Sequence, residues 1–176
     1  MSAVHDFKES LAASHSASDL PIWEEIYRKS FPDFLAMADH RQDGEHQRAG
    51  IDRSVILENS KQILIDEKIR WKPYADIAVE FLSNDRTGAP GWACKPLRAD
   101  YIAYAIAPLG MCYMLPVIQL QQAWARKGSL WKQTCFIVKA PNRGYTTYSA
   151  AVPVAELFAE IGRALRIPFK SMEGAA

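Results

Sequence analysis

Two aspartates and a lysine are spaced so that one short β-hairpin would bring them together. Asp52 and Asp66 lie symmetrically about Asn59, which begins an Asn-Ser turn signal between two strand-like runs. Two carboxylates brought together repel unless a cation lies between them, and Mg²⁺ is held by one or two carboxylates with waters and phosphate oxygens. Lys68 could then lower the pKa of a metal-bound water, orient it, or stabilise charge developing on phosphorus. The spacing predicts a Mg²⁺ site that acts on phosphate.

Glu67 is the unexpected residue of the second strand. Side chains alternate along a strand, so Asp66 and Lys68 share one face while Glu67 lies among isoleucines on the other. Charged residues alternating with apolar ones are typical of the solvent side of an antiparallel sheet. Three successive charges in mid-strand favour a local site instead. Whether Asp66 or Glu67 faces the metal stays open.

The elements that position these residues follow from hydrophobic periodicity and turn signals. The pattern predicts a helix over about residues 20–38, bent near Pro32, and then a polar loop. It next predicts strands over 51–58, 62–71, 76–82, 101–106 and 111–115, a helix over 117–127 that ends at Gly128, strands over 134–139 and 145–151, and a helix over 153–165. This order predicts an α/β or α+β fold in which helices flank a central mixed β-sheet.

Length and composition predict one domain. The chain has 176 residues, of which 49% are hydrophobic, enough for one well-packed core. We expect a flexible leader over residues 1–19, a single domain over 20–170 and a flexible tail over 171–176. Proline and glycine interrupt the uncharged run 101–120, which favours buried strands over a membrane helix. Three cysteines without a CxxC pair, and no secretion signal, predict a cytoplasmic protein.

The motif around the two aspartates resembles the signature of the PD-(D/E)XK, restriction-endonuclease-like nuclease superfamily. "GID" at residues 50–52, followed by "ILIDEK" at 63–68, is similar to an Asp, a hairpin, and apolar residues that lead into Asp/Glu-x-Lys. The resemblance implies that Asp52 and Asp66 bind Mg²⁺, with Mn²⁺ as a substitute, and that Lys68 assists the attacking water. It also implies an α-β-β-β-α-β core over roughly residues 20–127.

The chain departs from the family pattern at two positions. Gly50-Ile51 replaces the proline before the first Asp, and Glu67 occupies a position that is apolar in most members. The second departure leaves open which acid faces the metal. The stretch "GWACKPLRADYIAYAI" is similar to uncharacterised and phage-associated members.

Other side chains are candidates for the same or a competing site. The first helix of the family often supplies an acid, for which Glu24 and Glu25 are available, Glu25 being closer to the apolar side. Glu80 is either a third site carboxylate or a charge at a strand edge. His40 and His46 form a competing metal constellation, but their spacing does not place them on one helical face, so we interpret this segment as a solvated loop.

Charge is uneven along the chain. Residues 120–170 contain eight Lys or Arg and two Glu, or +6, although the whole chain carries only +1. Such a basic segment favours binding to the phosphates of DNA. The alternative interpretation is a solvated surface with uneven charge. Trp92 could stack on a base, although tryptophan more often closes a core. The expected DNA-contacting residues are Trp92, Lys95, Arg126, Lys132 and Arg143.

These observations predict a Mg²⁺-dependent deoxyribonuclease that hydrolyses phosphodiester bonds through a metal-activated water. The resemblance implies a homodimer as one arrangement for cutting two strands. The alternative is a catalytically inactive nuclease-like fold that acts as a DNA-binding or assembly subunit. A third hypothesis is a small metal-dependent hydrolase centred on His40 and His46, for which zinc would be the discriminating metal.

Overall fold

The computed structural model describes residues 20–162 and 164–172. The expected leader and most of the expected tail lie outside the described residues. The described chain divides into two compact units. The hairpin unit comprises residues 20–74, 97–117 and 164–172, and the inserted unit, which interrupts it twice, comprises residues 75–96 and 118–162.

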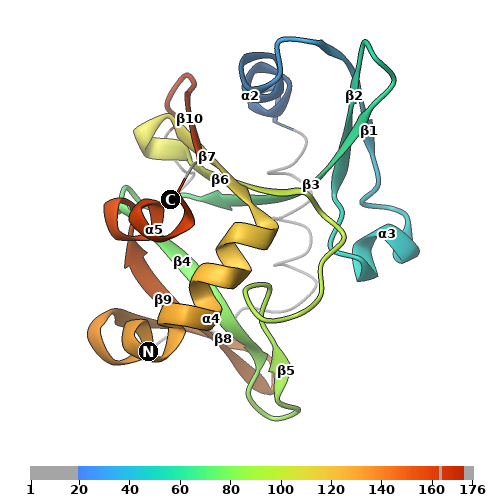
Figure 1. Ribbon diagram of the computed structural model, residues 1–176. Coiled ribbons are helices and arrows are strands. Elements are labelled where there is room, and N and C mark those ends of the chain that lie inside the picture. Colours follow the sequence, from blue (N-terminus) through green and yellow to red (C-terminus); the bar gives the residue numbers. More distant parts are fainter. Residues whose placement is uncertain (1–19, 163, 173–176) are drawn as a thin grey trace. The chain divides into compact units, whose positions relative to one another are not determined.

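The hairpin unit is built on a six-stranded mixed sheet in the order β1-β2-β3-β6-β7-β10 (Figure 1). Neighbouring strands are antiparallel except β3 and β6, which run parallel. The strands are β1 (Phe34–Asp39), β2 (Arg53–Leu57), β3 (Gln62–Arg70), β6 (Tyr101–Ile106), β7 (Met111–Pro116) and β10 (Leu165–Pro168). A mixed α+β fold is therefore confirmed.

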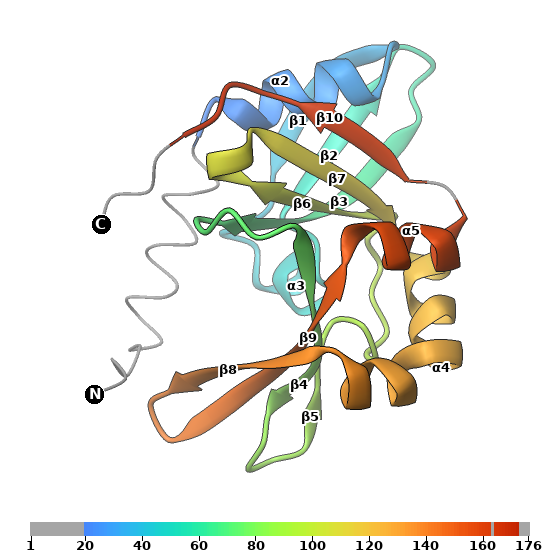
Figure 2. The same ribbon diagram turned by 90° about the vertical axis from the view of Figure 1, so that its left-hand side faces the viewer.

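Helix α2 (Ile22–Ser30) covers one face of this sheet (Figure 2). Its acidic residues lie in the first turn and its basic residues in the last, which complements the helix dipole. Its apolar residues recur at helical spacing and pack on the sheet residues that point to the same side. The core of this face comprises Ile22, Trp23, Ile26, Tyr27, Val55, Ile65, Ala103, Ala105, Cys112, Met114, Ile167 and Phe169.

The first predicted helix is wrong in its second half. The helix ends at Ser30, and Phe34–Asp39 forms β1, which pairs antiparallel with β2. Pro32 lacks an N–H and restricts the residue before it, so the chain leaves the helix before this position. The predicted polar loop contains a short helix, α3 (Gly44–Arg48), whose N-cap Asp43 accepts from two backbone amides.

The predicted hairpin of β2 and β3 is confirmed. Its ladder runs from Ile56 opposite Gln62 to Arg53 opposite Ile65. In the turn, the Asn59 side chain accepts from the Lys61 amide and Ser60 has a φ of 62°. The turn therefore sets the register that brings residues 52 and 66 to the end of the ladder away from the turn.

The inserted unit contains a four-stranded antiparallel sheet, in the order β5-β4-β9-β8, and two helices. The elements are β4 (Asp76–Asn84), β5 (Ala89–Pro90), α4 (Val117–Thr134), β8 (Phe136–Asn142), β9 (Tyr145–Pro153) and α5 (Val154–Ile161). The prediction that Gly128 ends the helix is wrong, because α4 continues through it. The final helix is also shorter than predicted, and β10 follows it.

Two connections bear on the predicted architecture. The segment from β3 to the parallel strand β6 contains β4 and β5 but no helix, so further strands interrupt the α-β-β-β-α-β order that the resemblance implies over residues 20–127. The uncharged run 101–120 forms β6, the 3₁₀ turn η1 (Ala107–Leu109), β7 and the start of α4. Within the described part of the chain, no helix is long and apolar enough to cross a membrane.

Candidate functional site

Asp52 and Asp66 face each other at the end of the β2–β3 ladder. The last registered pair is Arg53 with Ile65, and Asp52, the next residue, donates its amide to the Ile65 carbonyl while its carboxyl lies beside that of Asp66. The two carboxyl groups lie close enough for the Asp52 carboxylate to raise the pKa of Asp66. Lys68, two residues further along β3, forms an ion pair with Asp66. The structure thus brings together three residues that the sequence singled out.

The Asp66 carboxyl is buried beside a second carboxyl. Its side chain is 5% exposed, and burial, with the Asp52 carboxylate in addition, raises the pKa of Asp66 to about 7 in spite of the Lys68 ammonium. Burial and the neighbouring carboxylate thus favour the protonated form of Asp66, and a cation at this position would favour the ionised form.

Asp52 is held by both neighbouring strands. Its amide donates to the carbonyl of Ile65 over 2.9 Å, and its carbonyl accepts from the amide of His40 over 2.9 Å. Its carboxylate oxygen Oδ2 accepts from the backbone amide of Glu67 over 2.8 Å. Two hydrogen bonds thus fix the backbone of Asp52, and one fixes its carboxylate.

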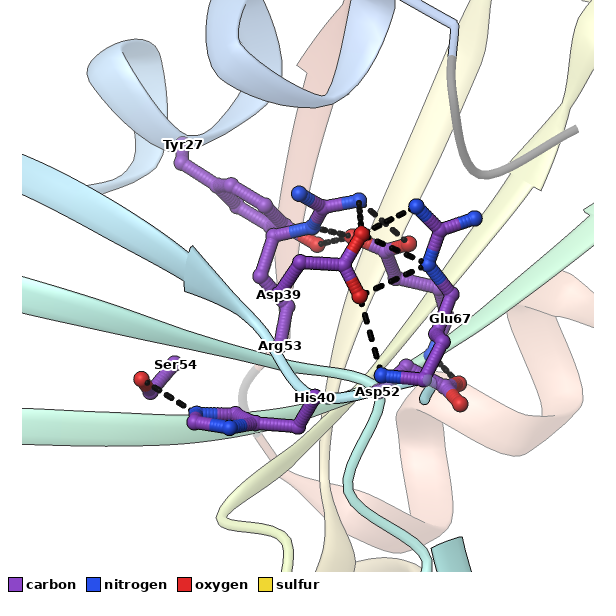
Figure 3. A network of polar contacts seen from close by, with 8 residues as sticks. Tyr27, Asp39, His40, Asp52, Arg53, Ser54 and Glu67 are labelled. Atoms are coloured by element: carbon purple, nitrogen blue, oxygen red, sulfur yellow. Dashed lines mark hydrogen bonds and ion pairs between the residues drawn. The ribbon is translucent and has the colours of Figure 1, made fainter. Parts of the chain in front are cut away.

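Glu67 points to the opposite face of the sheet, toward α2. Its side chain is fully buried, and its Oε1 accepts from the Tyr27 hydroxyl and from Arg53 Nε, each over 2.6 Å (Figure 3). Burial raises the pKa of Glu67, and the Arg53 guanidinium opposes that rise. The expectation that Glu67 could be a catalytic residue or a metal ligand is corrected: of the two neighbouring acids, Asp66 lies beside Asp52 and Glu67 binds Arg53 and Tyr27.

The network around Glu67 extends to the edge strand. Arg53 Nη2 lies 3.9 Å from Asp39 Oδ2, and Asp39 also forms an ion pair with Arg41. The hydrogen bond from Arg41 lowers the pKa of Asp39 to about 2. Sequence analysis missed Tyr27, Arg53 and Asp39. An acid on the apolar side of a strand is a signal that a buried partner exists, because an unpaired buried carboxylate is costly.

The acids of α2 do not join the aspartate pair. Glu24 and Glu25 lie on the solvent side of the helix and form ion pairs one turn along, with Arg28 and Lys29 respectively. Because α2 packs against the face that carries Ile65, it lies across the sheet from Asp66. The expectation that Glu25 supplies a site carboxylate is therefore corrected.

The remaining expected residues belong to the inserted unit. Glu80 lies in β4 opposite Ser149 of β9, and its backbone carbonyl accepts from the Ala93 amide. Trp92 is 5% exposed, so the expectation that its ring stacks on a base is corrected in favour of a core role. Lys95 is half-buried, and its carbonyl accepts from the Gln121 side chain.

Three exposed basic residues of the inserted unit differ in the contacts that they make. Arg126 Nη2 donates to the carbonyl of Glu160 over 2.8 Å. Lys132 Nζ lies over the Phe81 ring, 5.8 Å from its centroid. Arg143 is exposed in the turn between β8 and β9. All three residues are exposed, and each could bind a phosphate from solvent.

His40 and His46 stack on each other with ring centroids 4.2 Å apart. The Nε2 of His40 shares a hydrogen bond with Ser54 Oγ over 2.8 Å, and His46 Nδ1 lies 2.7 Å from Asp43 Oδ2. The rings face each other instead of converging on a third donor. In residues 20–162 and 164–172, no group of three or more His, Cys, Asp and Glu side chains is arranged to hold a metal.

The aspartate pair suits a hard divalent cation. Carboxylate oxygens are the ligands that Mg²⁺ and Mn²⁺ prefer, and Mg²⁺ uses one or two of them, with waters and phosphate completing its shell. The raised pKa of Asp66 shows that negative charge at this buried position needs compensation. Asp52 and Asp66 are the residues that would hold the cation.

Comparisons with known proteins do not assign a family: no family model, no curated protein and no solved structure matches this chain. A function is therefore argued from the geometry of the site.

Proposed function

We propose that the chain is a Mg²⁺-dependent DNA nuclease that hydrolyses phosphodiester bonds, with Mn²⁺ able to substitute. The observation that carries this proposal is the opposed pair of Asp52 and Asp66 with Lys68 beside it on the same strand. Two carboxylates and an ammonium group in this arrangement match the parts needed to hold a cation and to act on a phosphate.

The order of elements supports a restriction-endonuclease-like core. Helix α2 precedes the antiparallel strands β1, β2 and β3, and β6 then lies parallel to β3. The Asp-Glu-Lys triplet occupies β3, the second strand of the hairpin, as the resemblance implies. We infer that residues 75–96 of the inserted unit take the place of a connecting helix between β3 and β6.

The residues of the site have distinct roles in this proposal. Asp52 and Asp66 hold the cation, and a bound Mg²⁺ would supply Lewis-acid activation of water and neutralise phosphate charge. The side chain of Lys68 is 35% exposed, so its Nζ can reach a phosphate oxygen or an attacking water from solvent. Loss of the Asp66 proton would accompany metal binding, which makes binding stronger at higher pH.

The test is cleavage of plasmid and single-stranded DNA by the purified chain with Mg²⁺ or Mn²⁺. We expect Asp66→Asn and Lys68→Met each to reduce the rate by about 100-fold or more, because each removes a charge that the reaction uses. Glu24→Gln, which neutralises an exposed acid on α2, is the matched control and should cleave as the wild type does. Intact DNA under every metal condition, or unchanged rates in both site variants, would remove the nuclease proposal.

A second candidate function is a DNA-binding or assembly subunit without catalysis. It is favoured by the absence of a third metal-ligating side chain beside the pair among the described residues. This candidate predicts DNA binding that weakens with salt and does not depend on metal. Filter binding with and without EDTA separates the two functions, and sedimentation of the DNA complex would detect the proposed homodimer.

A further inference from the structure

A buried polar network lies directly behind the aspartate pair, on the opposite face of the sheet. Arg53 follows Asp52 in the chain, and Glu67 follows Asp66, so two residues of the network are each adjacent to one member of the pair. Arg53 Nε and the Tyr27 hydroxyl both donate to Glu67 Oε1 over 2.6 Å. Figure 3 shows Tyr27 reaching from α2 toward Glu67 and Arg53.

The pair and the network are connected by one backbone amide. The ladder between β2 and β3 ends at Arg53 and Ile65, and the Glu67 amide, two residues beyond, donates to the Asp52 carboxylate over 2.8 Å. The direction of this N–H follows from the backbone position of Glu67. That position is constrained by the Glu67 side chain, which two donors hold on the far face.

Burying a charged pair between the sheet and α2 costs desolvation free energy. The side chain of Glu67 is fully buried and that of Arg53 is 7% exposed, whereas the neighbouring strand position on the same face is Ile65. Replacing a buried ion pair with apolar residues is often neutral or stabilising, so such a pair is weak evidence of a role in stability. Its geometry, by contrast, is directional, because each donor fixes where Glu67 lies.

We propose that Tyr27, Arg53 and Glu67 are positioning residues that fix the Glu67 amide and thereby hold the Asp52 carboxylate beside Asp66. This inference rests on the proposed function, in which Asp52 and Asp66 hold the cation. Second-layer groups of this kind orient metal ligands and typically affect metal affinity by 10- to 100-fold when they are lost. Tyr27 connects the metal site to the packing of α2.

The first experiment measures Mn²⁺ binding to the full chain by electron paramagnetic resonance, without DNA. Tyr27→Phe removes one hydroxyl and keeps the buried ring, and Tyr101→Phe is the matched control because it removes a hydroxyl from β6 outside the network. We expect Tyr27→Phe to weaken Mn²⁺ binding about tenfold. The control should bind as the wild type does, and cleavage by Tyr27→Phe should recover at high Mn²⁺.

The second experiment measures the hydrogen exchange rate of the Glu67 amide that connects the network to Asp52. Hydrogen exchange at the Glu67 amide should be slow in the wild type and faster in Tyr27→Phe, while the amide of Val55, elsewhere in the ladder, keeps its protection. Glu67→Gln provides a second variant that retains the shape of the side chain and weakens both of its hydrogen bonds.

The outcomes separate the two proposals. Unchanged Mn²⁺ affinity and unchanged Glu67 amide exchange in both variants would overturn the positioning role even if the wild type cleaves DNA. If the wild type leaves DNA intact while Tyr27→Phe still weakens Mn²⁺ binding, the nuclease proposal fails and the positioning role stands. A wild type that binds no Mn²⁺ overturns both.

Discussion

Asp66 makes the folded chain less stable as the pH rises. The folded state binds the Asp66 proton with a pKa of about 7, whereas the unfolded chain releases it near the ordinary value of 3.8. Between these two pH values the folded state holds more protons than the unfolded state, so the free energy of unfolding decreases with increasing pH. The stability contributed by protonated Asp66 is present below about pH 4 and lost above about pH 7.

Asp66→Asn should therefore stabilise the protein at high pH. Asparagine keeps the shape and cannot ionise, which removes the cost of a buried carboxylate. We expect the free energy of unfolding at pH 8 to increase by on the order of 2 to 4 kcal/mol, and the gain to disappear near pH 4. Thermal denaturation of both proteins from pH 4 to 8.5, without divalent metal, measures this. An equal or lower melting temperature for the variant at pH 8 would contradict it.

The sequence predicted the aspartate pair but not its support. Asp52 and Asp66 could be placed together because a hairpin turn and strand alternation are local rules. Whether Asp66 or Glu67 lies beside Asp52 depended on the register of the hairpin. Strand alternation predicts which side of the sheet a side chain occupies, but not which residues surround it there. Tyr27 lies 40 residues from Glu67 in the chain, a separation at which no spacing rule applies.

At the scale of elements, the largest error was the edge strand. The sequence "FLAMAD" of β1 contains good helix formers and follows a helix, so local propensity favours helix. Pairing with β2 overrides this preference, because strand formation depends on the neighbours that a segment meets in the sheet. Strands with strong alternation or a buried apolar run, such as β3 and β6, were predicted within one or two residues.

Gly128 shows how packing reverses a local rule. Alanine in a helix interior is normally more stable than glycine by roughly 0.5–1 kcal/mol. At this position a Cβ would lie 2.7 Å from Cε2 of Trp124, and that indole stacks on Phe81 with centroids 5.6 Å apart. The ring is therefore not free to move aside.

We expect Gly128→Ala to destabilise the protein by about 1–3 kcal/mol, the usual cost of overpacking. Ser129→Ala, at an exposed position of the same helix, is the control and should be neutral or slightly stabilising. Urea denaturation of the three proteins compares them. If Gly128→Ala gained stability, as the ordinary helix preference predicts, then the contact with Trp124 would not be limiting.

At the scale of the whole molecule, the proposed catalytic residues and the expected DNA-contacting residues lie in different units. The aspartate pair and Lys68 belong to the hairpin unit, whereas Lys132 and Arg143 belong to the inserted unit. The chain leaves the hairpin unit after residue 74 and returns at 97. The insertion could not be predicted from composition at these two points. It is defined by the pairing of β3 with β6, which are far apart in the chain.

This division predicts that DNA affinity and metal affinity can be changed separately. Neutralising two cations that contact phosphates reduces the slope of log affinity against log salt concentration by about 2, because each contact releases about one counterion. We expect this change in Lys132→Gln/Arg143→Gln, with weaker DNA binding and unaltered Mn²⁺ affinity. The matched control is Lys61→Gln/Lys72→Gln, which removes two exposed charges from the hairpin unit. Equal slopes for both double variants would show that the inserted unit does not contact the DNA backbone through these side chains, because only a phosphate contact gives the counterion term.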